Sequence, residues 1–215
     1  MSREYFGTAR REIVPHLPAR AERILELGCG TGATIAMIKS LRRVAWAGGV
    51  ELFEDAARQA EAQCDRVWRA DIERTPIETE IPPGSLDLIL CLDVLEHLVD
   101  PWTAVKRITP LLRPGGQMIV SIPNVRNYKF IRDLLFKGRF RYADAGLLDR
   151  THLRFFVRET AIELAEAGGL RVTKAVNAQP WGPWEARRML SRLTFGGLDG
   201  LMVKQWLIVA EQPMA

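Results

Sequence analysis

The most constraining feature of this sequence is a short apolar segment that breaks into alternating glycines. Residues 24–27 form the apolar segment, and Gly28, Gly30 and Gly32 follow before a stretch with the pattern of a helix. Glycine tolerates positive φ and places no Cβ between the main chain and a ligand, and the first turn of a helix has unpaired N–H groups. The sequence therefore predicts a strand–turn–helix unit whose backbone can lie directly against a nucleotide-type cofactor.

Apolar stretches alternate with helical patterns along the rest of the chain. The candidate strands are residues 24–27, 44–50, 66–69, 86–92, 118–122, 170–176 and 206–210. The candidate helices are residues 34–41, 53–63, 101–112 and 158–167. This alternation is typical of an α/β protein built on a largely parallel sheet. A chain of 215 residues, of which 47% are hydrophobic, can bury one sizeable core, so we expect a single domain over residues 1–215.

Two segments depart from this alternation. Residues 124–157 are too long for an ordinary connection, and we expect them to form a lid inserted after the fifth strand. Basic side chains are concentrated there: residues 126–158 contain nine basic and three acidic side chains, which is 9 − 3 = +6, although the whole chain carries only +4. Residues 177–203 contain several prolines and glycines, so we expect an irregular connection before the last strand.

The cysteine content and the hydropathy pattern bear on the compartment. The three cysteines, Cys29, Cys64 and Cys91, are odd in number and lack the spacing of a metal site, which favours a reducing environment. No stretch approaches the ~20 consecutive apolar residues that a membrane-spanning helix needs, and the first twenty residues lack the apolar core of a signal peptide. We therefore expect a cytoplasmic protein.

Acidic side chains after the glycine turn distinguish between nucleotide cofactors. The glycine spacing by itself also fits the dinucleotide-binding fingerprint. Glu26, however, lies at the end of the first strand, where its carboxylate would repel a pyrophosphate and attract an ammonium group. Glu51 ends the next strand, where it can accept hydrogen bonds from both hydroxyls of a ribose, and Asp71 and Ile72 follow the third strand, where they can contact an adenine. The fourth strand then leads into residues 93–97, where we expect a helix that carries polar groups at the cleft.

These residues, in this order, resemble the class I S-adenosylmethionine-dependent methyltransferases, and the resemblance extends from Ile24 to Ala210. It implies a Rossmann-like α/β fold with a seven-stranded sheet, an antiparallel last strand and helices on both faces. It also implies that S-adenosyl-L-methionine binds at the carboxyl ends of the first strands and leaves as S-adenosyl-L-homocysteine. The cofactor-binding residues expected from this resemblance are Glu26, Gly28, Cys29, Gly30, Gly32, Glu51, Leu52, Asp71, Ile72, Leu92 and Asp93.

Three further motifs resemble a narrower bacterial subgroup. Residues 93–98, 121–124 and 148–156 are similar to a subgroup that is related to the ubiquinone-biosynthesis O-methyltransferases and whose members often accompany glycosyltransferases in surface-glycan pathways. The resemblance favours an O-methyltransferase whose acceptor is the hydroxyl of a sugar or of another small molecule. Close relatives methylate quinones and other metabolites, so the class of acceptor stays open at this point.

An alcohol acceptor must lose a proton as its oxygen takes the methyl group, so the chain should provide a base. It has three histidines, His16, His97 and His152. His97 follows the fourth strand and His152 lies in the expected lid, so we expect these two to face each other across the cleft and to be the catalytic pair. Asp149 is expected to orient one of them.

The same side chains allow a metal site as an alternative. Asp93, Glu96 and His97 would share one face at positions i, i+3 and i+4 of a helical turn, and His152 would add a fourth ligand. This set resembles the Mg²⁺ site of small-RNA 3′-terminal 2′-O-methyltransferases, although Asp93 stands where that family has glutamate. We expect no metal. Three alternatives to a small-molecule O-methyltransferase stay open. The first is a Mg-dependent 2′-O-methyltransferase acting on RNA. The second is a catalytically inactive, cofactor-binding partner of a glycosyltransferase, and the third is a nicotinamide oxidoreductase.

The basic segment also indicates what the acceptor is like. Its arginines and lysines lie among seven aromatic side chains, and such cations pair well with phosphate. We therefore expect residues 124–157 to bind the acceptor, which would be anionic, as a nucleotide-linked or lipid-linked sugar is. RNA is a weaker candidate on the same electrostatics. Phe130, Ile131, Leu134 and Leu135 form an apolar helical stripe that we expect to pack on the domain, with a membrane surface as the alternative partner.

Overall fold

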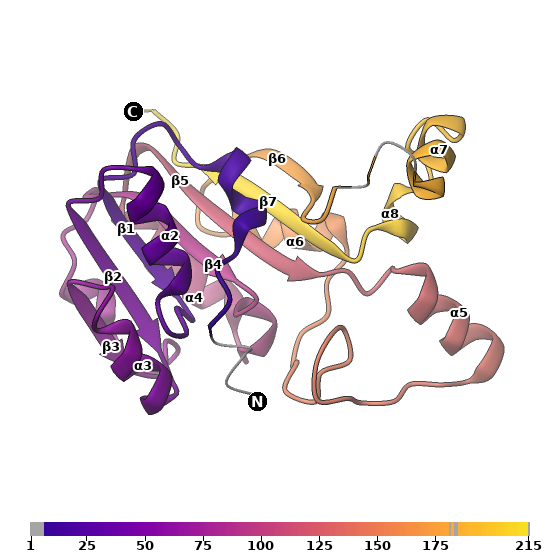
Figure 1. Ribbon diagram of the computed structural model, residues 1–215, viewed down its shortest axis with the longest axis horizontal. Coiled ribbons are helices and arrows are strands. Elements are labelled where there is room, and N and C mark those ends of the chain that lie inside the picture. The colour runs from indigo at the N-terminus through magenta and orange to yellow at the C-terminus, as the bar shows by residue number, and fades with distance from the viewer. Residues whose placement is uncertain (1–6, 181, 183–184, 215) are drawn as a thin grey trace.

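The computed structural model describes residues 7–180, 182 and 185–214, and it contains one seven-stranded sheet (Figure 1). The strands are β1 (Arg23–Leu27), β2 (Trp46–Glu51), β3 (Arg66–Arg69), β4 (Leu86–Leu92), β5 (Leu112–Pro123), β6 (Arg171–Asn177) and β7 (Gln205–Glu211). Their order across the sheet is β3-β2-β1-β4-β5-β7-β6. Strands β1 to β5 pair in parallel, and β7 runs antiparallel to both of its neighbours. The predicted α/β sheet with an antiparallel last strand is confirmed.

Helices cover both faces of this sheet, as predicted. The α-helices are α2 (Ala33–Leu41), α3 (Glu54–Ala60), α4 (Pro101–Ile108), α5 (Tyr128–Lys137), α6 (Arg158–Glu166), α7 (Ala186–Leu193) and α8 (Asp199–Met202). The 3-10 helices are η1 (Arg11–His16), η2 (Ile77–Thr79), η3 (Leu95–His97) and η4 (Thr109–Leu111). One face of the sheet packs on η1 and α2, and the other packs on α4 and α6.

The central strands supply alternate side chains to two apolar cores. Leu88 and Leu90 of β4 pack with residues of η1 and α2, whereas Ile89 packs with residues of α4 and α6 on the opposite face. Every residue of β4 is buried, as is usual for a strand that is covered on both faces. A fully buried leucine or isoleucine contributes about 1.5–3 kcal/mol to folding. This double core fixes the strand ends that carry the candidate site.

The helix expected over residues 101–112 is shorter than predicted. Helix α4 ends at Ile108, and the 3-10 helix η4 follows it over the next three residues. Pro110 explains the change, because proline has no N–H to donate and its ring clashes with the preceding helical turn. Strand β5 consequently begins at Leu112, earlier than the expected start at residue 118.

The helix expected at residues 93–97 is also wrong. The 3-10 helix η3 covers three residues there, Asp93 precedes it with a left-handed φ of 56°, and Leu98 leaves it in an extended conformation. The chain must then reach Pro101, and a proline disfavours the helical conformation in the residue before it. Asp93 therefore does not share a helical face with the residues of η3.

Residues 124–157 leave the sheet after β5 and return beside it. The Val125 N–H donates to the Phe156 carbonyl at 2.9 Å, and a bridge between Asn124 and Phe156 closes the base of the segment. Further along, the N–H groups of Leu153 and Arg154 donate to the Glu96 carbonyl. These bonds attach the returning part of the segment to η3. We refer to residues 124–157 as the lid.

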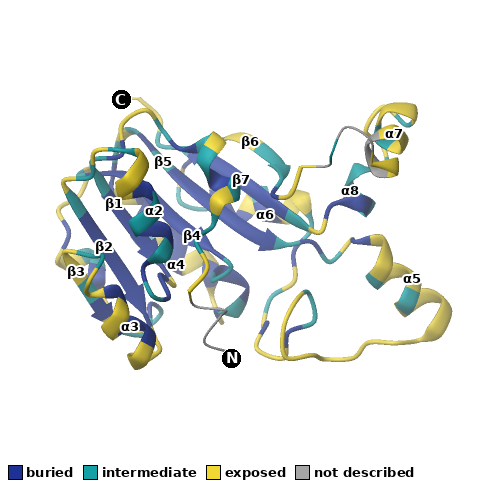
Figure 2. Ribbon diagram, in the orientation of Figure 1, coloured by how far each residue is buried: buried dark blue, intermediate teal, exposed yellow. Residues whose placement is uncertain are grey.

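Helix α5 of the lid exposes the apolar stripe that we expected to pack on the domain. No residue of α5 is buried, and the exposed fractions of Leu135 and Phe136 are 71% and 78%. Figure 2 shows the helix as an exposed element that lies away from the sheet. Phe130 packs its ring on Phe140 within the lid, with centroids 5.6 Å apart. The predicted packing on the domain is wrong, because the lid carries α5 away from the sheet.

The connection from 177 to 203 contains more regular structure than predicted. It includes α7 and α8, which lie at the same end of the molecule as α5 (Figure 1). Gly196 and Gly197 lie between these two helices and do not interrupt either of them. Within this connection, residues 181, 183 and 184 are outside the described residues. In the part of the chain that the structure describes, no helix is both long and apolar enough to cross a membrane.

Candidate functional site

The glycine turn is attached to the end of the neighbouring strand. The N–H groups of Gly28 and Cys29 both donate to the Val50 carbonyl, at 2.8 and 3.0 Å. Gly28 has a φ of 67°, and a Cβ at this position would approach the Val94 side chain to 3.1 Å. The conformation and the close contact both require glycine. The turn therefore presents bare backbone at the carboxyl end of β1.

A cavity of about 580 Å³, which we name the glycine-turn cavity, opens beside this turn. Ten of the eleven residues expected to bind the cofactor line it: Glu26, Gly28, Cys29, Gly30, Glu51, Leu52, Asp71, Ile72, Leu92 and Asp93. The eleventh, Gly32, is absent from the lining and is the N-terminal cap of α2, with a φ of 78°. The structure thus gathers the residues that the sequence pattern singles out around one space.

Glu26 is buried in this cavity with an unsatisfied oxygen. Among the described residues, its Oε2 has no hydrogen-bond partner. Burial, together with the neighbouring Cys64, raises the pKa of Glu26 well above its usual range, although a hydrogen bond with Thr34 and the charge of Arg10 act in the opposite direction. A carboxylate in such a place needs a cation beside it. The ammonium group of an amino-acid moiety fits that requirement.

Two other acids hold the backbone around the cavity. Glu51 accepts hydrogen bonds from the N–H groups of Gly30 and Phe53, one on each carboxylate oxygen and both at 2.9 Å. Asp71 accepts from the Glu73 N–H at 2.9 Å. A carboxylate oxygen has more than one lone pair, so both acids can still accept a hydrogen bond from a ligand.

Asp93 lies where the glycine-turn cavity meets a second cavity. We name this second space, of about 690 Å³, the lid cavity, and Asp93 lines both. Arg10 donates to one oxygen of Asp93, and Gln205 donates to the other. Ser121 Oγ accepts from the same two side chains, at 3.1 Å from Arg10 and 2.7 Å from Gln205. This network fixes the carboxylate at the junction.

Three members of this network, Arg10, Ser121 and Gln205, were not predicted from the sequence. Arg10 lies 83 residues from Asp93, and no motif indicates that the segment before η1 folds over the strand ends. Gln205 begins β7 and Ser121 lies near the end of β5, and these strands are neighbours. Their proximity follows from the strand order. The resemblance to the methyltransferase sheet was the signal that could have found both.

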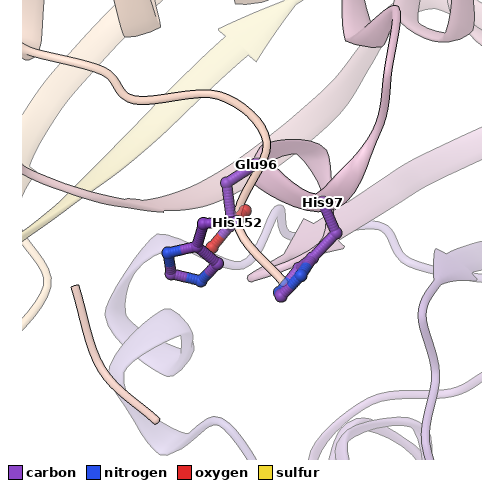
Figure 3. A group of neighbouring side chains, drawn as sticks. All are labelled: Glu96, His97 and His152. Carbon is purple, nitrogen blue, oxygen red and sulfur yellow. The ribbon is translucent and has the colours of Figure 1, made fainter. Parts of the chain in front are cut away.

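Three side chains converge beside the junction. Glu96 and His97 come from η3 and His152 comes from the lid, and their potential ligand atoms lie within 4.8 Å of one another (Figure 3). The two imidazole rings meet edge to face, with centroids 4.7 Å apart. Glu96 and His152 line the lid cavity, whereas His97 lines the glycine-turn cavity. The structure therefore brings the two predicted histidines together between the cavities.

Hydrogen bonds indicate which nitrogen of each histidine is free. His152 Nδ1 lies 3.0 Å from the Leu147 carbonyl, and His97 Nδ1 lies 3.2 Å from the Thr151 carbonyl. Because a carbonyl can only accept, both Nδ1 atoms carry a hydrogen. The lone pair of each neutral ring is then on Nε2. Burial and the neighbouring His152 lower the pKa of His97, which favours its neutral form.

Asp149 contacts His97 through Thr151. Thr151 Oγ1 donates to Asp149 Oδ1 at 2.7 Å and lies 3.0 Å from His97 Nδ1. Burial alone would raise the pKa of Asp149, but the hydrogen bonds from Thr151 and the two nearby imidazoles lower it overall, so the carboxylate stays charged. If Asp149 orients His97, as the sequence predicts, it does so through the Thr151 hydroxyl. No role for Thr151 was predicted from the sequence.

Glu96 is the unsatisfied member of this cluster. The residue is 1% exposed, and neither of its carboxylate oxygens has a hydrogen-bond partner among the residues that are described. Burial, together with the charge of Asp93, raises the pKa of Glu96 well above its usual range. A carboxylate in this position needs a proton, an imidazolium or a metal ion beside it.

The cluster can also hold a cation, but with fewer ligands than predicted. Within the described part of the chain, the candidate ligand group comprises Glu96, His97 and His152. Asp93 is not part of it, because η3 is too short to bring Asp93 onto the same face. Histidines that bind metals usually donate their other nitrogen to a carbonyl or a carboxylate, as both do here. One carboxylate and two imidazoles suit Mn²⁺, Fe²⁺ or Zn²⁺ better than Mg²⁺, which prefers oxygen ligands.

Comparison with known sequences agrees with this geometry. The family described as a methyltransferase domain matches residues 1–175. The ubiquinone biosynthesis O-methyltransferase of Albidiferax ferrireducens is 26% identical over 177 residues, which cover 75% of this chain and 68% of that protein. The protein of the same name from Burkholderia pseudomallei is 29% identical over 168 residues, which cover 72% of this chain and 69% of that protein.

Solved structures share the fold at lower identity. A SAM-dependent methyltransferase from Archaeoglobus fulgidus aligns with a TM-score of 0.67 at 19% identity, over 98% of this chain and 95% of that chain. An S-adenosylmethionine-dependent methyltransferase from Mesorhizobium loti aligns with a TM-score of 0.63 at 18% identity, over 96% and 100% of the two chains. The resemblance predicted from the motifs is confirmed. The chain belongs to the methyltransferase-domain family, and it shares its fold with S-adenosylmethionine-dependent methyltransferases.

Proposed function

We propose that this enzyme transfers the methyl group of S-adenosylmethionine to a hydroxyl oxygen of a small molecule, and that a sugar hydroxyl is the favoured acceptor. The observation that carries the proposal is the pair of free Nε2 atoms on His97 and His152 where the two cavities meet. The curated relatives are named O-methyltransferases, which supports oxygen as the acceptor atom. The sugar rests on the resemblance of the three motifs to glycan-associated methyltransferases.

We assign the donor to the glycine-turn cavity. Glu26, with its unsatisfied oxygen, would bind the ammonium of the methionine moiety. Glu51 would accept hydrogen bonds from the ribose hydroxyls, and Asp71 with Ile72 and Leu52 would contact the adenine. When bound, the cofactor supplies a sulfonium methyl group, which is already an electrophile. The protein then has only to align the acceptor oxygen and to remove its proton.

We assign proton removal to the histidine pair. His152 lines the lid cavity, so its Nε2 is the atom that would take the proton of an acceptor hydroxyl there. The buried Glu96 carboxylate would stabilise the imidazolium that forms. His97, oriented through Thr151, would keep its neutral ring against His152. The network of Arg10 and Gln205 would hold Asp93 between the donor and the acceptor.

A divalent cation at Glu96, His97 and His152 is the second candidate for activating the hydroxyl. The close convergence of these three side chains and the unsatisfied Glu96 favour it. Exhaustive chelation with EDTA distinguishes the two candidates. Activity that survives chelation supports the histidine base, whereas activity that is lost and returns with added Mn²⁺ supports the cation.

Methyl transfer from a labelled cofactor to nucleotide sugars, lipid-linked sugars, quinols and a short RNA tests the proposal. We expect the label in a small-molecule hydroxyl. His152→Ala and His97→Ala should lower turnover by about 100-fold. His152→Ala should leave the affinity for S-adenosylhomocysteine unchanged, because His152 lines only the lid cavity. His16→Ala on η1 is the control, because His16 lies outside both cavities.

The alternatives correspond to different outcomes of this screen. Label in RNA alone would replace the proposal with RNA 2′-O-methylation. Binding of S-adenosylhomocysteine without methylation of any acceptor would favour the non-catalytic partner of a glycosyltransferase. Membership of the methyltransferase family leaves the nicotinamide oxidoreductase without support.

We also propose a cytoplasmic location and a peripheral contact with a membrane. The three cysteines are all free thiols, which is typical of a reducing compartment. Leu134 and Leu135 are exposed on α5 among basic side chains, and a basic amphipathic helix of this kind binds anionic lipid surfaces. Co-sedimentation with anionic vesicles, with neutral vesicles as the control, tests this contact.

A further inference from the structure

The structure divides the nine basic residues of positions 126–158 into two groups. Six do not line the lid cavity: Arg126, Arg132, Lys137, Arg150, Arg154 and Arg158. Arg132 and Lys137 pair with Asp133, and Arg150 pairs with Asp144 at 2.9 Å. Arg154 donates to the Val99 carbonyl at 3.0 Å. Arg126 and Arg158 line a separate cavity.

The other three basic residues line the lid cavity. They are Lys129, Arg139 and Arg141, and Lys204, from the turn before β7, joins them there. In the described part of the chain, none of these four side chains forms an ion pair, whereas Asp133 of the same lining is already paired. The lining also contains the carboxyl groups of Asp93, Glu96, Asp133 and Asp149. Asp93 and Asp133 pair with other basic side chains, and none of the four forms an ion pair with these cations in the described part of the chain.

An aromatic cluster is formed by the residue between two of these cations. Phe140 lies between Arg139 and Arg141 in the chain, and its ring packs edge to face on three others. The partners are Phe130, Tyr142 and Phe155, with centroids 5.6, 5.4 and 6.2 Å away. Aromatic pairs with this geometry stabilise a structure beyond their buried area. The two arginines are thus attached to a packed cluster within the lid.

The lining of the lid cavity combines buried and exposed groups. Asp149 and His152 are buried, whereas Lys129, Arg139 and Arg141 are exposed. A cavity of about 690 Å³ has the size of a site for a small molecule, whereas an RNA strand is usually bound along an extended basic groove. A small acceptor that spans the cavity would place one part beside His152 and another among the cations.

We propose that the acceptor carries a phosphate or diphosphate group, which Lys129, Arg139, Arg141 and Lys204 bind while its hydroxyl lies beside His152. This inference rests on the proposed O-methyltransferase function. Guanidinium groups form paired, charge-assisted hydrogen bonds with phosphate oxygens, and lysines add point charges. A nucleotide diphosphate sugar and a lipid diphosphate sugar share this chemistry.

Calorimetric titration of sodium pyrophosphate into the full-length enzyme saturated with S-adenosylhomocysteine tests the site directly. We expect pyrophosphate to bind the wild type, and the double variant Arg139→Gln/Arg141→Gln to bind it about tenfold more weakly. The matched control is Arg58→Gln/Arg150→Gln, which removes the same charge at two exposed arginines that pair with acids outside both cavities and should leave the affinity unchanged. No binding by the wild type, or equal weakening in both double variants, would overturn the proposal.

The titration also separates this inference from the proposed function. If S-adenosylhomocysteine binds and pyrophosphate does not, the phosphate site fails and the methyltransferase assignment stands. If pyrophosphate does bind, methylation assays identify the source of the phosphate. The acceptors compared are nucleotide diphosphate sugars, polyprenyl diphosphate sugars and the same sugars without phosphate. Methylation of either phosphorylated class supports the proposal, with a higher KM in Arg139→Gln/Arg141→Gln. Methylation of only the unphosphorylated sugars, or of RNA alone, refutes it.

Discussion

The two cavities that meet at Asp93 differ in how they are built and in their charge. The glycine-turn cavity is formed by strand ends and by the turns attached to them, and its charged lining is largely acidic, with Glu26, Glu51 and Asp71. The lid cavity is closed by an insertion and has four unpaired cations in its lining. The sheet core therefore fixes the cavity that we assign to the donor, whereas much of the cavity that we assign to the acceptor is supplied by an insertion, which joins the core through Phe156.

Polar contacts join these two sides at η3. The lid is attached to η3 by backbone bonds to the Glu96 carbonyl, and His152 reaches the cluster from the lid. A change at Glu96 or His152, which line only the lid cavity, should therefore alter catalysis without altering the affinity for the donor. The following predictions test that separation.

The largest expected effect is the loss of turnover in Glu96→Gln. The substitution keeps the shape of the side chain but removes the acid that could become a carboxylate beside an imidazolium. Turnover should fall by about 100-fold, measured as initial rates with the acceptor found by the screen. The affinity for S-adenosylhomocysteine should stay the same. Tm should not fall, because neither oxygen of Glu96 has a hydrogen bond to lose among the described residues.

The exposed Glu163 on α6 provides the control. Glu163→Gln makes the same substitution at a site outside both cavities and should change neither turnover nor Tm. A clear drop in the Tm of Glu96→Gln would instead identify Glu96 as a structural residue.

The next effect concerns the donor side. Gly28→Ala places a Cβ against Val94 at the edge of the glycine-turn cavity, so we expect the affinity for S-adenosylhomocysteine to fall by about tenfold, or about 1.4 kcal/mol. Gly84 has a similar φ of 64° with no atom near its would-be Cβ. Gly84→Ala should therefore cost the same backbone strain of about 1 kcal/mol and leave the affinity intact. Equal affinities in the two variants would contradict a donor site at the glycine turn.

A smaller effect is expected on the link between Asp149 and His97. Thr151→Val removes the hydroxyl that donates to Asp149 and contacts His97, so kcat should fall by about tenfold, with KM for the donor unchanged. Thr151→Ser keeps the hydroxyl and should restore most of the rate. If Thr151→Ser is as slow as Thr151→Val, the side-chain methyl of Thr151 matters and its hydrogen bonds to Asp149 and His97 do not.

The sequence was sufficient to predict which residues gather at the glycine-turn cavity, because local backbone chemistry determines their positions. The glycine spacing, the acid at each strand end and the alternation of apolar segments are local patterns, and the residues that they single out do surround one cavity. Pro110 is also a local signal, because a proline there predicts the end of α4 before residue 110. The strand order came from the resemblance, since no local pattern specifies it.

The acceptor side could be predicted only in part because its contacts join distant segments. The pairing of His97 with His152 was found from their positions relative to the sheet. The roles of Arg10 and Thr151 were not, since they depend on where the N-terminal segment and the lid fold. The exposed face of α5 was also missed: its apolar spacing is the same whether the helix packs on the domain or lies apart from it.

The smallest expected effect on stability lies in α5. Leu90→Ala in the sheet core should lower the free energy of unfolding by about 2–5 kcal/mol, because Leu90 is fully buried. Leu135→Ser, at a residue that is 71% exposed, should change it by less than about 0.5 kcal/mol. Urea denaturation measures both, and anionic vesicles should retain less of the Leu135→Ser protein than of the wild type. If Leu135→Ser destabilises the protein as much as Leu90→Ala does, then α5 packs against the domain in solution, and the lid is an extension of the core.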